Sequence, residues 1–537
     1  MSDYTRIRTP FTAMSFTPDV PSNALGPMEY NSGRNIEADV RGVKKVPGEE
    51  YILSAIPGNV IFMDGGFRNE ATWVYIAATR EGKWYMLTSS GVTNITPGVG
   101  SNPNVALSGY ADGLNITSSW VGNVFFINDT LRPPMYFQPT ATEIYLYDSA
   151  PDNYVWNYDV GVSATRAGFV RNYCSPNVGN ILIAGNLTKD YTAGTTVNYP
   201  TTIRWSQMFA NTGVPDSWMP TLNNVANEQE VPVRGPLIDG FFLGANFYVC
   251  SYWDTVMISP LAYQNSSAPV FGVRLFNQGR GLINNNCWTN TDANVYGVDS
   301  RGVWVFDGSN FNSIDNQRVR NYLFANLSNT YSDRIFVVNN TQKYQIEIYY
   351  PDQDSTGWCN KMLSYRYDLQ VWNAPKDIDN ACNGCEGPVF VGGAFKYASR
   401  TVVYGTGSSA GSQLVQTGVG NSFRGNAIDA LFERNNMALQ TENGPVPYSS
   451  KVYVHRVLPE ITGTGNIDIT IGGANSTAQT PVYGQTGTVA VDTNTPWVTT
   501  QQNSVRTISV KVESNDATDT WNLTALNWQA TIVEDSF

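Results

Sequence analysis

The stretch that decides the fold is Asn294–Gly308, NVYGVDSRGVWVFDG. Two short apolar runs, Val295–Val298 and Val303–Phe306, flank a polar turn that contains Gly302. β-Branched and aromatic residues favour strands, and a glycine-containing turn of this length joins two antiparallel strands. The stretch therefore predicts a tight β-hairpin in which Trp304 is packed.

The same pattern stands far earlier in the chain, at Trp73–Gly91, where Arg80-Glu81-Gly82 is the turn and Trp84 takes the place of Trp304. More degenerate copies recur at intervals of about 40–60 residues, as repeated supersecondary units do. These copies begin at Ser118, Asn180, Phe241, Arg334 and Pro388. The repeated hairpins predict an all-β protein.

Loose repeats of this length, with no helical pattern between them, are typical of β-propeller blades. We expect a propeller over residues 51–416, with about six to eight blade-like segments. A solenoid would show a tighter repeat, and a stack of ordinary sandwich domains is the alternative fold. One helix is expected within this region, at Asn316–Leu327, with Asp315 as its N-cap.

The two ends of the chain differ from the repeats. Residues 1–50 contain four early prolines and predict an extended arm that leads into a first strand. After a Gly- and Ser-rich boundary at Gly405–Gly420, residues 421–537 alternate between apolar and polar side chains. Such alternation predicts a C-terminal antiparallel β-sandwich domain, with one face of each strand buried.

The net charge, the apolar runs and the number of cysteines argue against several classes of function. The net charge of −12 argues against a protein that wraps nucleic acid, because only basic side chains release counterions from phosphate. We expect no signal peptide, because MSDYTRIRTPFTAMSF lacks a basic start and an apolar core. No apolar run is long enough to span a bilayer, so no membrane insertion is expected. Six cysteines are too few for a disulfide scaffold and predict reduced thiols.

No residue pattern rises to a catalytic or metal motif. His455 is the only histidine and stands in a predicted strand, so a packed or solvent-facing role is expected. Cys382 and Cys385 have metal-ligand spacing and Cys359 is near in sequence, but no further pair completes a zinc site. We therefore predict no enzyme activity, no catalytic residues, no cofactor and no metal.

Two stretches that contain aspartates are partly similar to known functional motifs. Asp352 and Asp354 lack the spaced acidic ladder of a calcium loop. The segment from Asp299 to Trp304 is similar to the Asp-box turn of sialidases, but it lacks that motif's Ser-x-Asp and Thr-Trp parts. A tight hairpin with a buried tryptophan explains it better. Carboxylate pairs for glycoside hydrolysis converge in space and leave little trace in a sequence.

One further stretch, Thr202–Pro220 (TIRWSQMFANTGVPDSWMP), has R-W-S followed by D-S-W and proline. It resembles a segment in the nozzle or hub proteins of short-tailed bacteriophages, the tail tubular protein B and P22-type tail accessory (head-stabilisation) families. Asp39–Gly48, Asn123–Phe137, Asn294–Gly308 and Thr507–Ala530 resemble other motifs of these families, in the same order. The chain departs from them at Thr524-Ala525, where glycine is usual, and in being shorter than the T7-type members.

The resemblance implies a structural virion protein located in the tail and assembled in the host cytoplasm. It implies a homo-oligomer, a sixfold ring below the portal and its adaptor proteins, with a β-propeller beside β-sandwich elements in each subunit. Such a ring continues and gates the channel through which genomic DNA passes, and it seats tail fibres or tailspikes. The residues that carry the structural motifs are Trp84, Arg204, Trp205, Ser206, Trp218 and Trp304.

Two other functions stay open at this point. The first is a carbohydrate-binding or glycan-cleaving propeller, related to lectins, depolymerases or sialidases. The feature that would distinguish it is a pocket in which acidic and aromatic residues converge. The second is an intracellular scaffold of the WD-repeat type, which is disfavoured because Trp-Asp endings and Gly-His starts are absent from the predicted blades.

Overall fold

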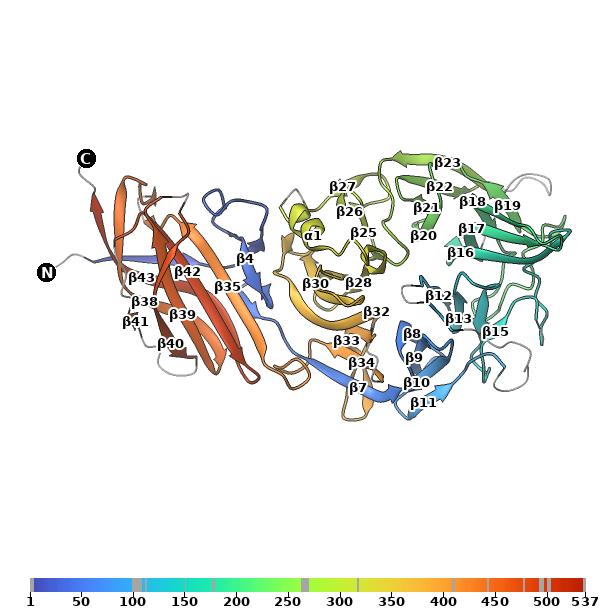
Figure 1. Ribbon diagram of the computed structural model, residues 1–537, viewed down its shortest axis with the longest axis horizontal. Helices are drawn as coiled ribbons and strands as arrows, with labels where there is room; N and C mark the ends of the chain where they lie inside the picture. Colours follow the sequence, from blue (N-terminus) through green and yellow to red (C-terminus); the bar gives the residue numbers. More distant parts are fainter. Residues whose placement is uncertain are drawn as a thin grey trace.

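The chain folds into a β-propeller joined to a β-sandwich (Figure 1). The computed structural model describes residues 4–98, 109–111, 114–149, 151–175, 179–261, 270–315, 318–407, 411–441, 444–476, 479–491, 497–499 and 504–534. Nearly every described element is a strand, and both chain ends lie at the sandwich. The all-β propeller fold predicted from the repeats is therefore confirmed.

Five blades are separate four-stranded antiparallel sheets. Blade 1 contains β8 (Val60–Phe67), β9 (Trp73–Thr79), β10 (Trp84–Thr88) and β11 (Gly91–Asn94). Blade 2 contains β12 (Thr117–Val121), β13 (Val124–Asn128), β14 (Met135–Phe137) and β15 (Tyr145–Leu146). Blade 3 contains β16 (Val162–Ser175), β17 (Gly179–Tyr191), β18 (Thr196–Trp205) and β19 (Asn227–Glu230). Blade 4 contains β20 (Leu237–Leu243), β21 (Asn246–Ser251), β22 (Asp254–Pro260) and β23 (Phe271–Gln278). Blade 5 contains β24 (Trp288–Asn290), β25 (Val295–Asp299), β26 (Gly302–Phe306) and β27 (Phe311–Ser313).

The two remaining blades share one eight-stranded sheet, because β30 also pairs with β32. Blade 6 contains β28 (Phe336–Asn340), β29 (Gln345–Tyr350), β30 (Cys359–Arg366) and β31 (Val371–Trp372). Blade 7 contains β32 (Lys376–Val391), β33 (Ala394–Thr406), β34 (Ser412–Thr417) and β7 (Glu49–Ile56). The described residues thus form seven blades, within the predicted range.

Strand β7 closes the ring. It precedes blade 1 in the sequence, yet it pairs antiparallel with β34 and is the outermost strand of blade 7. In Figure 1 this blue strand lies beside the orange strands of blade 7. Noncovalent closure of this kind protects the edge of the last blade and links it to the first.

The hairpin predicted at Asn294–Gly308 is present. Asp299 pairs with Gly302 across the turn, so Ser300 and Arg301 form a two-residue loop. Gly302 has φ of 145° and an added Cβ would lie 2.1 Å from the Asp315 carboxylate, which explains why glycine stands there. Trp304 is fully buried.

The sandwich draws strands from both ends of the chain. One sheet contains β1 (Thr5–Pro10), β5 (Ile36–Ala38), β6 (Val43–Lys45), β38 (Ser450–Thr464), β41 (Val498–Thr499) and β43 (Thr520–Glu534). The other contains β4 (Ser32–Arg34), β35 (Ile428–Met437), β39 (Asn466–Ala474), β40 (Val482–Ala490) and β42 (Thr507–Asp516). The N-terminal arm is therefore part of the sandwich sheets, and its strands β1, β4 and β6 pair with strands more than 390 residues later in the chain.

Two further ladders contain only two strands each, one in the arm and one in the C-terminal region. The arm strands β2 (Ser15–Phe16) and β3 (Glu29–Tyr30) pair in parallel. The other ladder, β36 (Gln440–Thr441) with β37 (Gly444–Pro445), lies in the C-terminal region. The single-turn 3₁₀ helix η1 (Ser332–Arg334) leads into blade 6.

The predicted helix is shorter than expected, and its predicted cap is wrong. Helix α1 spans Arg320–Asn326, while Asn316 lies outside the described residues. Asp315 instead accepts hydrogen bonds from the Val303 amide and the Ser313 hydroxyl, so its carboxylate is used by the β26 hairpin. The first turn of α1 is capped from the arm, by a residue distant in the sequence: Asp19 accepts from the Asn321 and Tyr322 amides.

Candidate functional site

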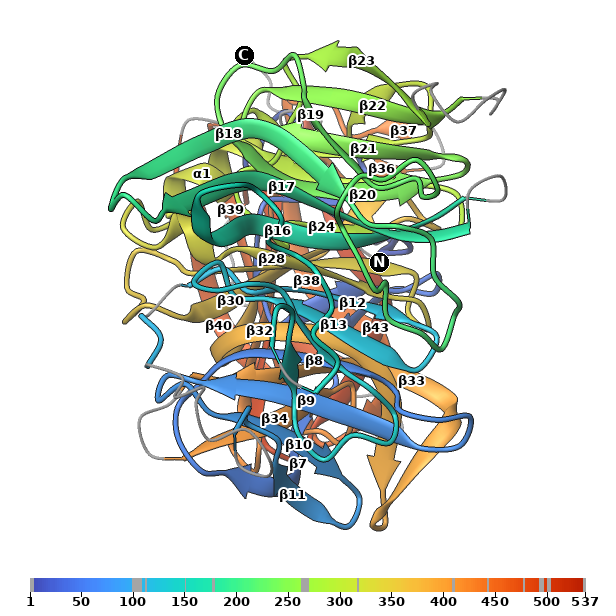
Figure 2. The same ribbon diagram turned by 90° about the vertical axis from the view of Figure 1, so that its right-hand side faces the viewer.

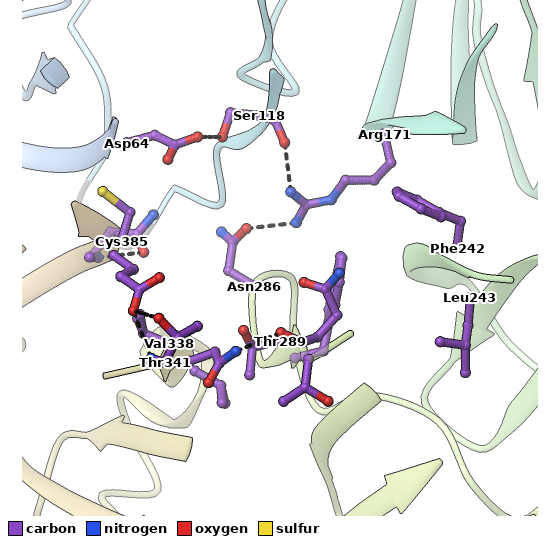
Figure 3. A pocket seen from close by; sticks show the side chains of 18 of the residues that line it. Asp64, Ser118, Arg171, Phe242, Leu243, Asn286, Thr289, Val338, Thr341 and Cys385 are labelled. Atoms are coloured by element: carbon purple, nitrogen blue, oxygen red, sulfur yellow. Dashed lines mark hydrogen bonds between the residues drawn. The ribbon is translucent and has the colours of Figure 1, made fainter. Parts of the chain in front are cut away.

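A cavity of about 550 Å³ lies on the propeller axis, and we call it the axial cavity. The first strand of every blade contributes to its wall, so these strands lie nearest the axis. Figure 3 shows side chains from all seven blades around this space: Asp64 of β8, Ser118 of β12, Arg171 of β16, Phe242 of β20, Thr289 of β24, Val338 of β28 and Cys385 of β32. Cavities of this size hold small molecules in many proteins.

The cation in the wall is Arg171, and it is held by a two-point ion pair. Its Nε and Nη2 donate to the two carboxylate oxygens of Asp239, at 2.8 and 2.6 Å. The indole N–H of Trp288 donates to the same carboxylate at 2.8 Å, and the guanidinium lies 5.3 Å from the centroid of that ring. A bidentate pair of this kind is strong and fixes geometry. Asp239 therefore neutralises the positive charge of Arg171 and orients it.

Asn284, Asn285 and Asn286, which we call the asparagine segment, lie between blades 4 and 5, and Asn286 lines the axial cavity. Asn286 Nδ2 donates to the Ile116 carbonyl at 2.9 Å, and its Oδ1 accepts from Arg171 at 2.7 Å. Asn286 also lines a second cavity of about 30 Å³, together with the other two asparagines. Phe62, Asn286 and Asn383 line both cavities, so the two cavities share this part of their wall.

Hydrogen bonds link the asparagine segment to blades 2, 3 and 6. The Val337 amide donates to the Asn286 carbonyl at 3.0 Å, and Asn285 Nδ2 donates to the Gly168 carbonyl at 3.1 Å. Asn286 has φ of 63°, a left-handed conformation that asparagine tolerates better than most residues. An asparagine at this position suits both the backbone turn and the two-sided hydrogen bonding.

The wall of the axial cavity also contains the carboxylates of Asp64 and Glu386. Asp64 accepts from the Ser118 hydroxyl at 2.6 Å and from the Gly65 amide at 2.7 Å, and burial raises its pKa. One oxygen of Glu386 accepts from both the amide and the hydroxyl of Thr341, each at 2.6 Å. Both carboxylates are thus positioned by blade residues at the cavity wall, and Figure 3 shows that of Asp64 beside Ser118.

The Arg-Trp-Ser motif lies in blade 3, away from the axial cavity. Arg204 is fully buried and pairs with Asp159 at 2.7 Å and Glu228 at 2.5 Å, and Lys189 pairs with the same two carboxylates. The guanidinium also lies 4.4 Å from the Tyr158 ring centroid. A buried charge requires such partners, so the motif holds the outer strands of this blade together.

The other motif residues pack in blades too. Ser206 accepts from the Leu182 amide at 3.0 Å, and the Trp205 indole donates to the Val225 carbonyl at 2.6 Å. Trp218 is fully buried, with its ring 4.7 Å from that of Trp156. Trp84 and Trp304 are both fully buried but are not equivalent, because Trp84 pairs with Ala78 in the core shared with blade 2, whereas Trp304 pairs with Gly297 and packs against Phe241 of blade 4. The structure brings none of these six residues into the axial cavity.

The candidate catalytic and metal-binding residues do not form a common site within the described ranges. His455 shares a hydrogen bond with Thr531 at 2.8 Å in the sandwich, and Asp352 caps its own turn by accepting from the Asp354 amide. Burial raises the pKa of the Cys382 thiol to about 12, which disfavours a metal-binding thiolate. Within the described ranges, no group of three or more His, Cys, Asp and Glu side chains is placed to hold a metal ion.

The axial cavity residues were not predicted from the sequence. Asp64, Arg171, Asp239 and Asn339 stand in different blades and follow no shared motif. The run Asn284-Asn285-Asn286 between two predicted strands was the one visible feature that pointed to this place. Three consecutive asparagines in a connection between two strands are unusual, and they indicate a segment whose side chains make buried hydrogen bonds.

Comparisons with known proteins find structural likeness only. No protein-family model matches the chain, and no curated protein matches it. A crystal structure of BBS1N in complex with ARL6DN, soaked with mercury, aligns with a TM-score of 0.37 at 9% identity, covering 71% of this chain and 98% of that chain. The same complex soaked with lead aligns with a TM-score of 0.38 at the same identity and coverage. Likeness at this level carries no argument about function.

No helix among the residues placed by the structure combines the length and apolar character needed to cross a bilayer.

Proposed function

We propose that this chain is a structural protein of a short-tailed bacteriophage virion, a subunit of the nozzle or hub ring below the portal and its adaptor. The observation that carries the proposal is the two-part architecture. A seven-bladed propeller is joined to a sandwich that both chain ends build, which agrees with what the resemblance of the ordered motifs implies. The proposed role is mechanical and needs no catalytic residues.

The contact between the propeller and the sandwich supports a mechanical role. One continuous apolar core runs from the sandwich through the arm into blades 4 to 6. Phe432 of the sandwich contacts Tyr30 of the arm, Tyr30 contacts Phe16, and Phe16 contacts Tyr322 of helix α1, with ring centroids 5.3–5.5 Å apart. Packed aromatic contacts of this kind favour one fixed orientation of the two parts, which a ring subunit requires.

In the proposed assembly the DNA channel lies between subunits. Side chains from all seven blades surround the axial cavity of about 550 Å³, and Asn286 joins Ile116 and Arg171 there by hydrogen bonds, so the propeller axis offers no path for a duplex. A closed ring forms from heterologous contacts whose rotation closes, and a homo-hexamer is the expected form. The acidic, largely uncharged-polar chain would let DNA pass without binding it, while other surfaces seat tail fibres or tailspikes.

Quantitative mass spectrometry of purified virus particles tests the proposal. We expect this chain at about one copy for every two portal subunits, the ratio of a sixfold ring on a twelvefold portal. Recombinant subunits that stay monomeric would not decide the matter, since assembly can require the portal as a template. Absence of the chain from particles would refute the virion role.

A further inference from the structure

Two aromatic side chains of blade 4 are exposed at the turn between β21 and β22. Trp253 is 49% exposed and Tyr252 is 40% exposed. The Trp253 ring rests on Gly235, where an added Cβ would lie 3.0 Å from it, and the Trp253 carbonyl accepts a hydrogen bond from the Gly279 amide at 2.6 Å. The ring is thus held in place at the surface, and rigid exposed tryptophan and tyrosine side chains carry much of the binding energy in protein interfaces.

Two arginines flank this aromatic pair. The Arg234 side chain is 61% exposed, while its ion-pair partner Asp254, at 2.6 Å, is buried. Arg301 is exposed as well, and an added Cβ on Gly279 would lie 2.6 Å from its guanidinium. Within the described residues Arg301 forms no ion pair. We call Arg234, Tyr252, Trp253 and Arg301 the basic patch, because the charged groups that it presents to solvent are guanidinium groups.

A second surface, where blade 2 connects to blade 3, carries the opposite charge. Asp148, Asp152 and Asp216 are all exposed, and we call them the acidic patch. The Asp148 amide donates to the Tyr154 carbonyl at 2.8 Å, and Asp152 accepts from the Tyr136 hydroxyl at 2.9 Å. Burial raises the pKa of the Tyr154 phenol, and the nearby charges of Asp152 and Asp216 raise it further. Among the residues that the structure describes, no lysine or arginine pairs with these three carboxylates.

An exposed apolar side chain lies beside the acidic patch. Met219 follows Asp216 by three residues and is 42% exposed. The amide of Trp218, which precedes it, donates to the Val155 carbonyl at 2.8 Å, so this segment is fixed to the connection between the blades. Methionine adapts its shape and packs well against aromatic rings. The acidic surface therefore complements the basic patch both in charge and in its apolar contact.

We propose that the basic patch of one copy binds the acidic patch of a second copy of this chain, with Trp253 packed against Met219. Two basic patches would repel each other, and so would two acidic ones, so the contact joins different surfaces of the two copies. Strands β15 and β22, beside the two patches, lie apart on the propeller (Figure 1), so one copy can use both patches at once. Contacts of this heterologous kind form a ring when the rotation closes. The inference rests on the proposed ring and identifies the contact between its subunits.

Sedimentation velocity of the full chain tests this contact. We expect association that grows with concentration and weakens at high salt, because salt screens exposed charges. Arg301→Glu and Asp216→Lys should each weaken association at least about tenfold. Neither side chain forms an ion pair among the described residues, so both variants should fold, as unfolding midpoints would establish. Trp253→Ala should weaken association too, and it replaces Arg301→Glu should that variant not fold.

A mixture of the two charge variants shows whether the contact joins different patches. Each variant keeps one intact patch, so the mixture should form a dimer with one copy of each, while either variant alone stays largely monomeric at the same concentration. Arg41→Glu and Glu70→Lys are matched controls, because they make the same changes of charge at exposed positions outside both patches. Both controls should associate as the original chain does.

Three results would overturn the inference: an original chain that stays monomeric at low salt and at every concentration, folded charge variants that associate as tightly as the original chain, or a mixture that forms no dimer. A monomeric original chain overturns this contact alone, since the virion role is tested by the presence of the chain in particles. Patch-dependent association of a chain that is absent from particles would refute the virion role and leave the contact in place.

Discussion

At the scale of single residues, the blades repeat one packing device: a glycine stands opposite an aromatic residue on the neighbouring strand. Gly297 pairs with Trp304, Gly65 with Tyr75, and Gly185 with Phe169. A Cβ added at Gly297 would lie 2.3 Å from the Trp304 ring, so the indole covers the glycine and leaves no room for a side chain. In these three blades the aromatic ring fills the space that the glycine leaves in the core.

Trp304→Ala should lower the free energy of unfolding by about 3–5 kcal/mol, because it leaves a cavity in a fully buried site. It also removes the indole N–H that donates to the Gly281 carbonyl at 3.2 Å. Trp253→Ala is the matched control, since Trp253 is 49% exposed. Denaturant unfolding of both variants measures the difference, and equal midpoints would contradict the packing role of Trp304.

Glu37 should make stability depend on pH in acid. Burial opposes its ionisation, but the attraction of Lys343 and Lys44 outweighs burial and lowers its pKa to about 2, from 4.5. The folded pKa lies below the unfolded value, so the unfolded state binds the proton first as pH falls. The contribution, about 3 kcal/mol by linkage, is complete at neutral pH and is lost between about pH 4.5 and 2.

Glu37→Gln should therefore destabilise the protein at pH 7 and flatten this part of the pH profile. Unfolding free energies measured at several pH values compare it with the original chain. Glu70→Gln, at an exposed position, should keep the original profile. If Glu37→Gln also keeps that profile, the two lysines do not stabilise the carboxylate.

At the scale of elements, the N-terminal arm connects parts that the sequence separates. Its strands β1, β5 and β6 continue the sheet of β43, and β4 pairs with β35. Between these strands, Asp19 caps helix α1, and the phenol oxygen of Tyr30 accepts a hydrogen bond from the Ala374 amide at 3.1 Å. The arm thus holds the propeller and the sandwich in contact.

Asp19→Ala should weaken the start of helix α1. Its carboxylate accepts from the Asn321 and Tyr322 amides at 2.7 and 2.8 Å, and no side chain caps the helix from within its own segment. Loss of a cap costs about 1 kcal/mol, so these two amides should exchange their hydrogens faster. Hydrogen exchange followed by NMR or mass spectrometry measures this, and unchanged exchange would show that Asp19 is not the cap.

At the scale of the whole molecule, the ring and the sandwich both close through residues near the N-terminus. Glu49 of β7 is fully buried and pairs with Lys376 at 2.7 Å and Arg424 at 2.6 Å, so one carboxylate joins the closing strand, blade 7 and the start of the sandwich segment. Removing either cation would destabilise the protein, because the buried carboxylate would lose part of the charge that compensates it. The closing strand and the connection to the sandwich are therefore coupled.

Shortened chains test whether ring closure depends on β7 and whether the sandwich depends on strands from both chain ends. A chain of residues 46–428 keeps β7, Glu49 and Arg424, and should stay soluble with one cooperative unfolding transition. A chain of residues 1–420 leaves β1, β4, β5 and β6 without their partners and should aggregate through exposed apolar strands.

A chain of residues 57–428 tests ring closure. It lacks β7, opens the edge of β34, and should also aggregate. Gel filtration and thermal unfolding distinguish these outcomes, and a soluble 57–428 chain would show that β7 is not needed for closure.

Local sequence determined the blades of this protein. Alternating apolar residues, short glycine turns and repeated tryptophans sufficed to predict the hairpins of blades 1 and 5 and the propeller class, because strand and turn preferences act over a few residues. The helix was placed correctly by the buried residues Val319, Leu323 and Leu327, but its start and cap were not.

Tertiary structure alone decided the ring closure by β7, the incorporation of the arm into the sandwich, the capping of α1 by Asp19, and the axial cavity. Asp64, Arg171 and Asn339 line this cavity from three blades, and none belongs to a pattern that a local reading could detect. Each of these features joins segments far apart in the chain. Their pairing depends on the register and order of whole sheets, which short stretches of sequence do not specify.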